Sequence, residues 1–183
     1  MNKTAVIFNS KTGFTEKYAL WIAEETKATP ISFKECTKKR VNEILSEYDT
    51  VIFGSRLHAG IIENLSKAKK LFGTGKNRFI IFTTGAAPAD TPETKDTLKK
   101  VWEQNLTAEE REQIPHFYMQ GGLCYEKMPF IDKIMMKGFV SMLKKKKDKD
   151  GLEAGMAKAV ESSFDISDKK YIMPLVDYLK KSN

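Results

Sequence analysis

The chain has 183 residues and a formal net charge of +7. This length is typical of one ordinary domain that buries a core without metal or disulfide staples, so we expect a single domain over residues 1–183. The two cysteines lie far apart and lack metal-site spacing, which indicates reduced thiols of a cytoplasmic protein. We expect no secretory leader, and the absence of any long uncharged apolar run excludes a membrane-spanning helix.

The positive charge is concentrated in one segment. Between Lys127 and Lys147 there are seven lysines and a single acid, Asp132, while the rest of the chain is close to neutral. A uniformly basic surface would be typical of a nucleic-acid-binding protein, whereas a local patch indicates a local partner. We therefore expect no nucleic-acid partner.

Five short segments predict strands, at residues 3–9, 31–33, 50–54, 78–83 and 116–120. The first, third and fourth are nearly continuous apolar runs, which is typical of parallel strands covered on both faces.

Helical periodicity fills most of the gaps between these strands, at residues 15–27, 63–72, 94–104 and 171–180, and a capping box at 107–110 opens a short helical turn. Because strand and helix alternate along the chain, the sequence predicts an α/β fold with a doubly wound parallel sheet.

The most informative motif follows the first strand and directly precedes the first helix. A helix N-terminus offers unpaired N–H groups and partial positive charge, to which this loop adds hydroxyl donors and a glycine that permits close approach. It lacks the ending of a Walker loop and the glycine pattern of dinucleotide sites. It predicts a site for a terminal phosphate monoester, although an ordinary capped turn is the alternative. The predicted residues are Ser10, Lys11, Thr12, Gly13, Phe14 and Thr15.

Two further loops, 54–60 and 83–88, follow the third and fourth strands and are rich in small residues. In a sheet of order 2-1-3-4-5, ligands bind beyond the carboxyl ends of strands 1 and 3, so all three loops are expected to converge there. A flat ring could be held between the second and third loops. The predicted ring contacts are Ser55, Arg56, Leu57, His58, Ala59, Gly60, Thr84, Gly85, Ala86 and Ala87.

Residues 10–15 resemble the Ser/Thr-x-Thr-Gly-x-Thr phosphate loop of flavodoxins, and the other two loops stand where that family holds its isoalloxazine ring. Residues 121–147, with Gly-Gly-Leu-Cys-Tyr, Asp-Lys, Met-Met-Lys and a basic tail, are similar to the flavodoxin-type, quinone-dependent protoporphyrinogen oxidases. The resemblance implies a five-stranded flavodoxin-like sheet of order 2-1-3-4-5, a helical insertion at about 123–150 after strand 5, and FMN as cofactor. The flavin itself would perform the redox chemistry, so no catalytic side chain and no metal are expected.

The chain departs from the family pattern in its aromatic residues and its charge. Neither Trp nor Tyr occurs in residues 54–62 or 83–90, so His58 is the only ring there, either a flavin contact or a polar loop residue. Arg56 could balance a reduced, anionic flavin or face solvent. His116, at a strand start, is expected to be structural. Flavodoxins are commonly acidic, whereas this chain is basic.

Residues 128–143 predict a helix with a broad apolar face and a narrow polar strip, followed by a run of lysines at 144–147. Interfacial helices combine these features, so residues 128–147 could contact an anionic membrane surface. Alternatively, the helix covers the protein's own crevice or a second copy in a homodimer. The expected apolar face comprises Ile131, Ile134, Met135, Phe139 and Met142.

Three functions remain open from the sequence. The first is an FMN-dependent oxidoreductase acting on a tetrapyrrole or a quinone. The second is an electron carrier between redox partner proteins. The third is a flavin-free interaction or membrane-surface module. The expected location is cytoplasmic, with peripheral contact at the inner face of the membrane.

Overall fold

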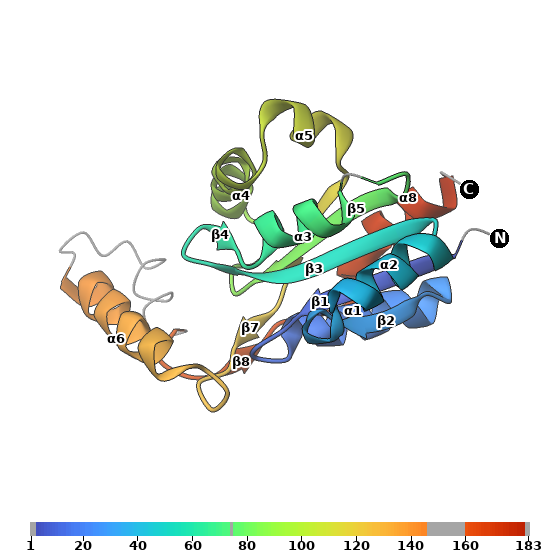
Figure 1. Ribbon diagram of the computed structural model, residues 1–183. Helices are drawn as coiled ribbons and strands as arrows, with labels where there is room; N and C mark the ends of the chain where they lie inside the picture. Colours follow the sequence, from blue (N-terminus) through green and yellow to red (C-terminus); the bar gives the residue numbers. More distant parts are fainter. Residues whose placement is uncertain (1–2, 74, 146–159, 182–183) are drawn as a thin grey trace.

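The computed structural model describes residues 3–73, 75–145 and 160–181. Five parallel strands form the centre of the molecule in the order β2-β1-β3-β5-β6 (Figure 1). This order confirms the predicted doubly wound sheet. The strands are β1 (Thr4–Asn9), β2 (Thr29–Ser32), β3 (Thr50–His58), β5 (Arg78–Gly85) and β6 (His116–Gln120).

Helices cover both faces of the sheet. They are α1 (Phe14–Thr26), α2 (Lys38–Glu47), α3 (Leu65–Phe72), α4 (Pro92–Asn105), α5 (Ala108–Gln113) and α8 (Met173–Lys181), with 3-10 turns η1 (Phe33–Glu35) and η2 (Lys169–Ile172). Alternate residues of one strand point to opposite faces. In β1, Val6 packs with α1 and α8, whereas Ile7 packs with α2 and α3. Burial on both faces explains the continuous apolar runs of these strands.

The sequence analysis missed α2, which buries only Val41 and Ile44. Its remaining residues are polar or charged, so its apolar stripe is too narrow to stand out. The helix begins at a recognisable cap, since the Thr37 side chain accepts a hydrogen bond from the Arg40 backbone N–H.

The predicted end of the third strand, at residue 54, was wrong. β3 continues to His58 and turns back through Ala59 and Gly60 into the short antiparallel strand β4 (Ile61–Ile62). Both turn residues have positive φ, 48° and 82°, as a two-residue hairpin turn requires. Residues 55–58 are therefore strand residues and not loop residues.

A helical insertion follows β6, as expected. It starts with β7 (Gly122–Leu123), which pairs antiparallel with β8 (Phe164–Asp165), and contains α6 (Phe130–Lys145). A Cβ on Gly122 would stand 2.0 Å from the carbonyl oxygen of Phe164, so only glycine permits this close pairing. Residues 146–150 of the expected insertion lie outside the described residues.

Helix α6 projects away from the sheet and its covering helices (Figure 1). Its apolar side chains at positions 130, 131, 134 and 135 are 76%, 71%, 55% and 49% exposed. The alternative that this face covers the protein's own crevice therefore does not hold for these residues; the side chains of Phe139 and Met142 lie outside the described part. Among the described residues, no helix is long and apolar enough to cross a bilayer.

Candidate functional site

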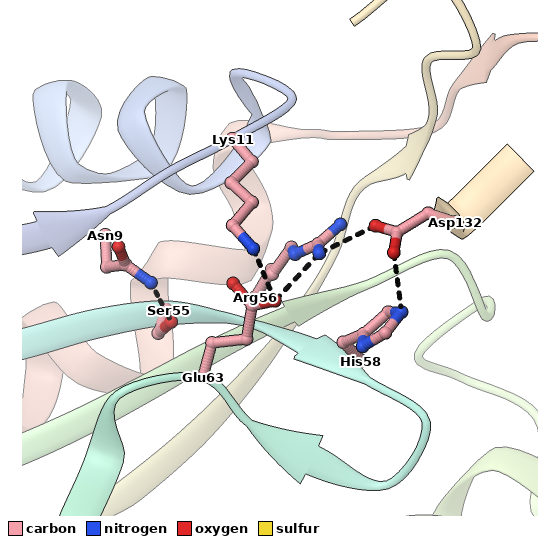
Figure 2. Close-up of polar contacts among 7 residues, drawn as sticks. All are labelled: Asn9, Lys11, Ser55, Arg56, His58, Glu63 and Asp132. Carbon is pink, nitrogen blue, oxygen red and sulfur yellow. Dashed lines mark hydrogen bonds and ion pairs between the residues drawn. The ribbon is translucent and has the colours of Figure 1, made fainter. Parts of the chain in front are cut away.

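The three loops predicted from the sequence meet at the carboxyl edge of the sheet. The strand register places Asn9 of β1 beside Ser55 of β3, and Ser55 beside Thr83 of β5. The Asn9 side-chain amide donates to the Ser55 hydroxyl at 3.0 Å (Figure 2). This edge, between β1 and β3, is where the strand order reverses and where such sheets bind ligands.

The first loop ends in an open helix N-terminus. Gly13 precedes α1 with a φ of 99°, which favours glycine. The first hydrogen bond within the helix runs from the Lys17 N–H to the Gly13 carbonyl at 2.9 Å. The N–H groups of Phe14, Thr15 and Glu16 therefore have no partner inside the helix. They are available to an anion at the position that the motif predicts.

No side chain caps this N-terminus, although hydroxyl groups are close by. By contrast, threonines cap the first turns of α2, α4 and α5. The Ser10 hydroxyl accepts from the Gly13 N–H at 3.1 Å and so shapes the loop. The buried Thr15 hydroxyl lies 2.8 Å from that of Thr84, and either can donate. When Thr84 donates, Thr15 keeps its hydrogen for a phosphate oxygen.

The predicted phosphate contact Phe14 has a second role. Its ring lies against the backbone of Gly121 and Gly122, where a Cβ would meet it at 3.2 Å and 2.9 Å. Only its backbone N–H faces the predicted anion site as a helix-terminal donor. The side chain instead fixes the start of the insertion next to the loop.

The third loop is held in place by β6. The Tyr118 hydroxyl donates to the Ala87 carbonyl at 2.7 Å, and a Cβ on Gly85 would stand 2.8 Å from that hydroxyl oxygen. Burial raises the pKa of Tyr118, so the phenol stays protonated. Ala86 and Ala87 thus form a short, supported loop beside the ends of β3 and β5.

Five charged or ionisable side chains connect this edge to the insertion (Figure 2). The Arg56 guanidinium contacts Glu63 at 2.7 Å and Asp132 of α6 at 2.8 Å through the same nitrogen, Nη2. Lys11 of the first loop contacts Glu63 at 3.0 Å, and His58 Nε2 lies 3.3 Å from Asp132. One network therefore joins the loop after β1, the end of β3 and the first turn of α6.

Charge pairing stabilises the ionised forms of this network. Burial lowers the pKa of Arg56, but hydrogen bonds to Glu63 and Asp132 outweigh it and raise the pKa above the ordinary value. Burial raises the pKa of Glu63, but hydrogen bonds from Arg56 and Lys11 outweigh it and lower the pKa overall. Arg56 Nε and Glu63 Oε2 are buried without a hydrogen-bond partner among the described residues. One donor and one acceptor at this edge can therefore still form a hydrogen bond.

The structure resolves several of the open interpretations of single residues. Arg56 is half-buried and paired, so it does not face solvent freely. His58 lies on β3, contacts α6 and is partly exposed. His116 is structural, as expected, because its Nδ1 lies 2.8 Å from the Ile114 carbonyl and its ring packs on Trp102.

Sequence reasoning missed Asn9, Glu63 and Asp132 as members of this site. Glu63 arrives through the unexpected hairpin, and its N–H bonds back to the Arg56 carbonyl at 3.1 Å. Asp132 is 76 residues from Arg56 along the chain. One clue was available: Asp132 is the only acid in a lysine-rich segment, and a buried acid needs a cation.

A cavity of about 440 Å³ lies between the first loop and the insertion. The loop contributes residues 12–14 on one side, and the insertion contributes Lys127 and Cys124 on the other. The complete lining is Thr12, Gly13, Phe14, Lys17, Leu123, Cys124, Lys127, Ser163, Phe164 and Asp165.

Comparison with known proteins places this fold and loop in a family. The model of the flavodoxin domain matches residues 5–150. The chain belongs to the flavodoxin domain family. This membership confirms the predicted resemblance and supports a flavin as cofactor, but it does not single out the protoporphyrinogen oxidase branch. No curated protein matches the sequence.

Solved structures of flavodoxin-type proteins are also similar to the chain. The flavodiiron core Flv1 of Synechocystis sp. PCC6803 gives a TM-score of 0.43 at 16% identity, over 65% of this chain and 29% of that one. A flavodoxin from the domain Archaea gives a TM-score of 0.41 at 17% identity, over 65% of this chain and 85% of that one. The chain therefore spans less than a third of the length of the flavodiiron core.

Proposed function

We propose that this flavodoxin-type protein binds FMN at the carboxyl edge of its sheet and acts as an FMN-dependent oxidoreductase. The observation that carries the proposal is the uncapped N-terminus of α1, which opens next to the ends of β3 and β5. The N–H groups of Phe14, Thr15 and Glu16 would hold the phosphate, and the hydroxyl groups of Ser10 and Thr12 lie in the same loop.

The residues of this edge also suit the flavin ring. Residues 55–60 would line one side of the ring and residues 84–87 the other, with backbone groups available to its polar edge. The charge of Arg56 is compensated by Glu63 and Asp132, but its buried Nε–H has no hydrogen-bond partner among the described residues and would be a donor near the ring. When bound, FMN would supply electron transfer, and the protein would supply binding and orientation.

The insertion supports an oxidoreductase over a simple carrier. A carrier that docks to soluble proteins would carry a charged rim around the flavin edge. Here the four exposed apolar side chains of α6 lie beside Lys133 and Lys137. We therefore propose an apolar electron partner, a quinone or tetrapyrrole, met at an anionic membrane surface on which α6 lies.

Flavin binding is tested by absorption spectroscopy after incubation with FMN and removal of the excess. The wild-type protein should retain a yellow chromophore. Replacing Thr12 with glutamate should abolish retention, because a carboxylate would stand in the loop that receives the phosphate. Thr97→Glu, at an exposed position of α4, is the matched control and should retain FMN. A colourless wild-type protein would contradict both redox functions and favour the flavin-free module.

Membrane contact is tested by cosedimentation with vesicles. The protein should sediment with vesicles that contain phosphatidylserine and stay in solution with phosphatidylcholine vesicles. The double variant Ile131→Ser/Ile134→Ser should lose sedimentation, because both side chains are exposed and apolar. Leu20→Ser, at a 49% exposed position of α1, is the control. Equal sedimentation of all three proteins would contradict the role of α6.

A further inference from the structure

The insertion carries a lysine over the phosphate loop. Lys127 lies between β7 and α6, and its ammonium nitrogen stands 3.8 Å from the point that a Cβ on Gly13 would occupy. Within the part of the chain that the structure describes, no other atom lies within 4 Å of that point, Gly13 and its chain neighbours aside. Among the described residues outside the loop, Lys127 therefore approaches Gly13 most closely on this side.

The pairing of the neighbouring lysines sets Lys127 apart. Lys11 contacts Glu63 at 3.0 Å, and Lys17 contacts Asp165 at 2.8 Å and Ser167 at 2.7 Å. Both cations are thus already compensated by a carboxylate. Lys127 has no carboxylate partner within the described part of the chain.

The acid next to Lys127 in the chain is engaged elsewhere. The Glu126 carboxylate accepts from the hydroxyl of Ser163 at 2.7 Å and from the thiol of Cys124 at 3.4 Å. A single uncompensated ammonium group next to uncapped backbone N–H groups is a charge arrangement suited to an anion.

The turn that carries Lys127 is fixed on both sides. The Tyr125 N–H donates to the Ser163 hydroxyl at 2.9 Å, and the Tyr125 hydroxyl donates to the Val160 carbonyl at 2.5 Å. Met128, the next residue after Lys127, is buried. Because the backbone on both sides of Lys127 is held, a ligand would need to order only the side chain of Lys127 and little of its backbone.

We propose that Lys127 binds the phosphate of the flavin and selects FMN over riboflavin. This inference rests on the proposed function and adds a residue from the insertion to the phosphate site. A dianionic phosphate at the α1 N-terminus would form an ion pair with the Lys127 ammonium group. Riboflavin has no phosphate and cannot form this ion pair. The insertion would thereby contribute to cofactor binding as well as to contact with the electron partner.

The test is fluorescence titration of FMN and of riboflavin with wild-type protein and with Lys127→Gln. At low salt, we expect the variant to bind FMN about tenfold more weakly, the scale of a partly exposed charge-assisted contact, and to bind riboflavin unchanged. The loss should shrink as salt is added, because screening weakens the same interaction in the wild-type protein. Lys127→Arg should restore most of the FMN affinity.

Lys100→Gln removes the same charge from an exposed position of α4 and is the matched control. It should leave FMN binding unchanged. Equal FMN affinity of wild type and Lys127→Gln would overturn the inference, as would an equal loss of FMN and riboflavin or an equal loss in the control. If wild-type protein takes up no FMN, the proposed function itself fails, and this inference fails with it.

Discussion

Replacing Asp132 with asparagine tests how the insertion is anchored to the sheet. In α6, Asp132 is buried, as is Met128 just before the helix, whereas Phe130 and Ile131 are exposed. Among the described residues, Asp132 therefore makes the polar contacts of this helix with the body, through Arg56 and His58. The substitution keeps the shape of the side chain and removes its charge.

The expected cost follows from the geometry of the ion pair. The Arg56 and Asp132 side chains are 13% and 12% exposed and lie 2.8 Å apart. Loss of such a charge-assisted hydrogen bond costs about 1.5–3 kcal/mol. Arg56 keeps Glu63, and asparagine keeps an acceptor oxygen, so we take about 2 kcal/mol, which is about a 30-fold change in an opening equilibrium.

The assay is hydrogen exchange measured by mass spectrometry on peptides from α6. An undocked helix of this length is marginal in water, so undocking exposes its amides to exchange. We expect exchange in α6 to become about 30-fold faster in Asp132→Asn, while the strands of the sheet keep their protection. Asp96→Asn, at an exposed position of α4, is the control. Unchanged exchange in α6, or the same acceleration in the control, would refute this reasoning.

Three further outcomes are expected. Glu63 has a lowered pKa in the folded protein, so its stabilising contribution is present above its unfolded pKa and is lost as the pH falls through its folded pKa. In Glu63→Gln, the free energy of unfolding should therefore fall less between about pH 7 and about pH 3 than in the wild-type protein, as measured by urea unfolding. Burial, and to a smaller extent Glu35, raise the pKa of the Cys36 thiol to about 11. Alkylation of Cys36 by iodoacetamide should therefore be slow near pH 8 and become faster as the pH approaches this pKa. A rate that levels off near the ordinary thiol pKa would contradict this expectation. Gly122→Ala should destabilise the β7–β8 pair by about 1–3 kcal/mol, because the added Cβ would meet the backbone of Phe164. Gly138→Ala should instead stabilise α6, because its Cβ would have nothing within 4 Å. Calorimetry and hydrogen exchange of the two variants measure these opposite effects.

The parts that could be predicted from sequence are those encoded by neighbouring residues. The predicted phosphate-binding motif occupies six consecutive positions, 10–15, between an apolar strand and an amphipathic helix, so its place at the α1 N-terminus follows from local pattern alone. The strand order followed from the alternation of strands and helices together with the family resemblance. The sheet topology confirms the strand order.

The parts that could not be predicted depend on distant contacts or on backbone conformation. The hairpin after β3 needs positive φ at Ala59, an uncommon conformation for a residue other than glycine. Without that hairpin, the contact of Glu63 with Arg56 and Lys11 cannot be anticipated. The contact of Asp132 with β3 depends on how the insertion folds back, which no local pattern encodes.

Phosphorus NMR of FMN bound to the protein tests the central proposal most directly. The second pKa of a free phosphate monoester lies near 6, so the resonance of free FMN moves between about pH 5 and about pH 7.5. Backbone N–H groups at the α1 N-terminus and the Lys127 ammonium would hold the phosphate as a dianion and lower that pKa. We therefore expect a shifted phosphorus resonance that stays constant over this pH range. A resonance that titrates near pH 6 in the presence of excess protein would contradict a phosphate held in this loop.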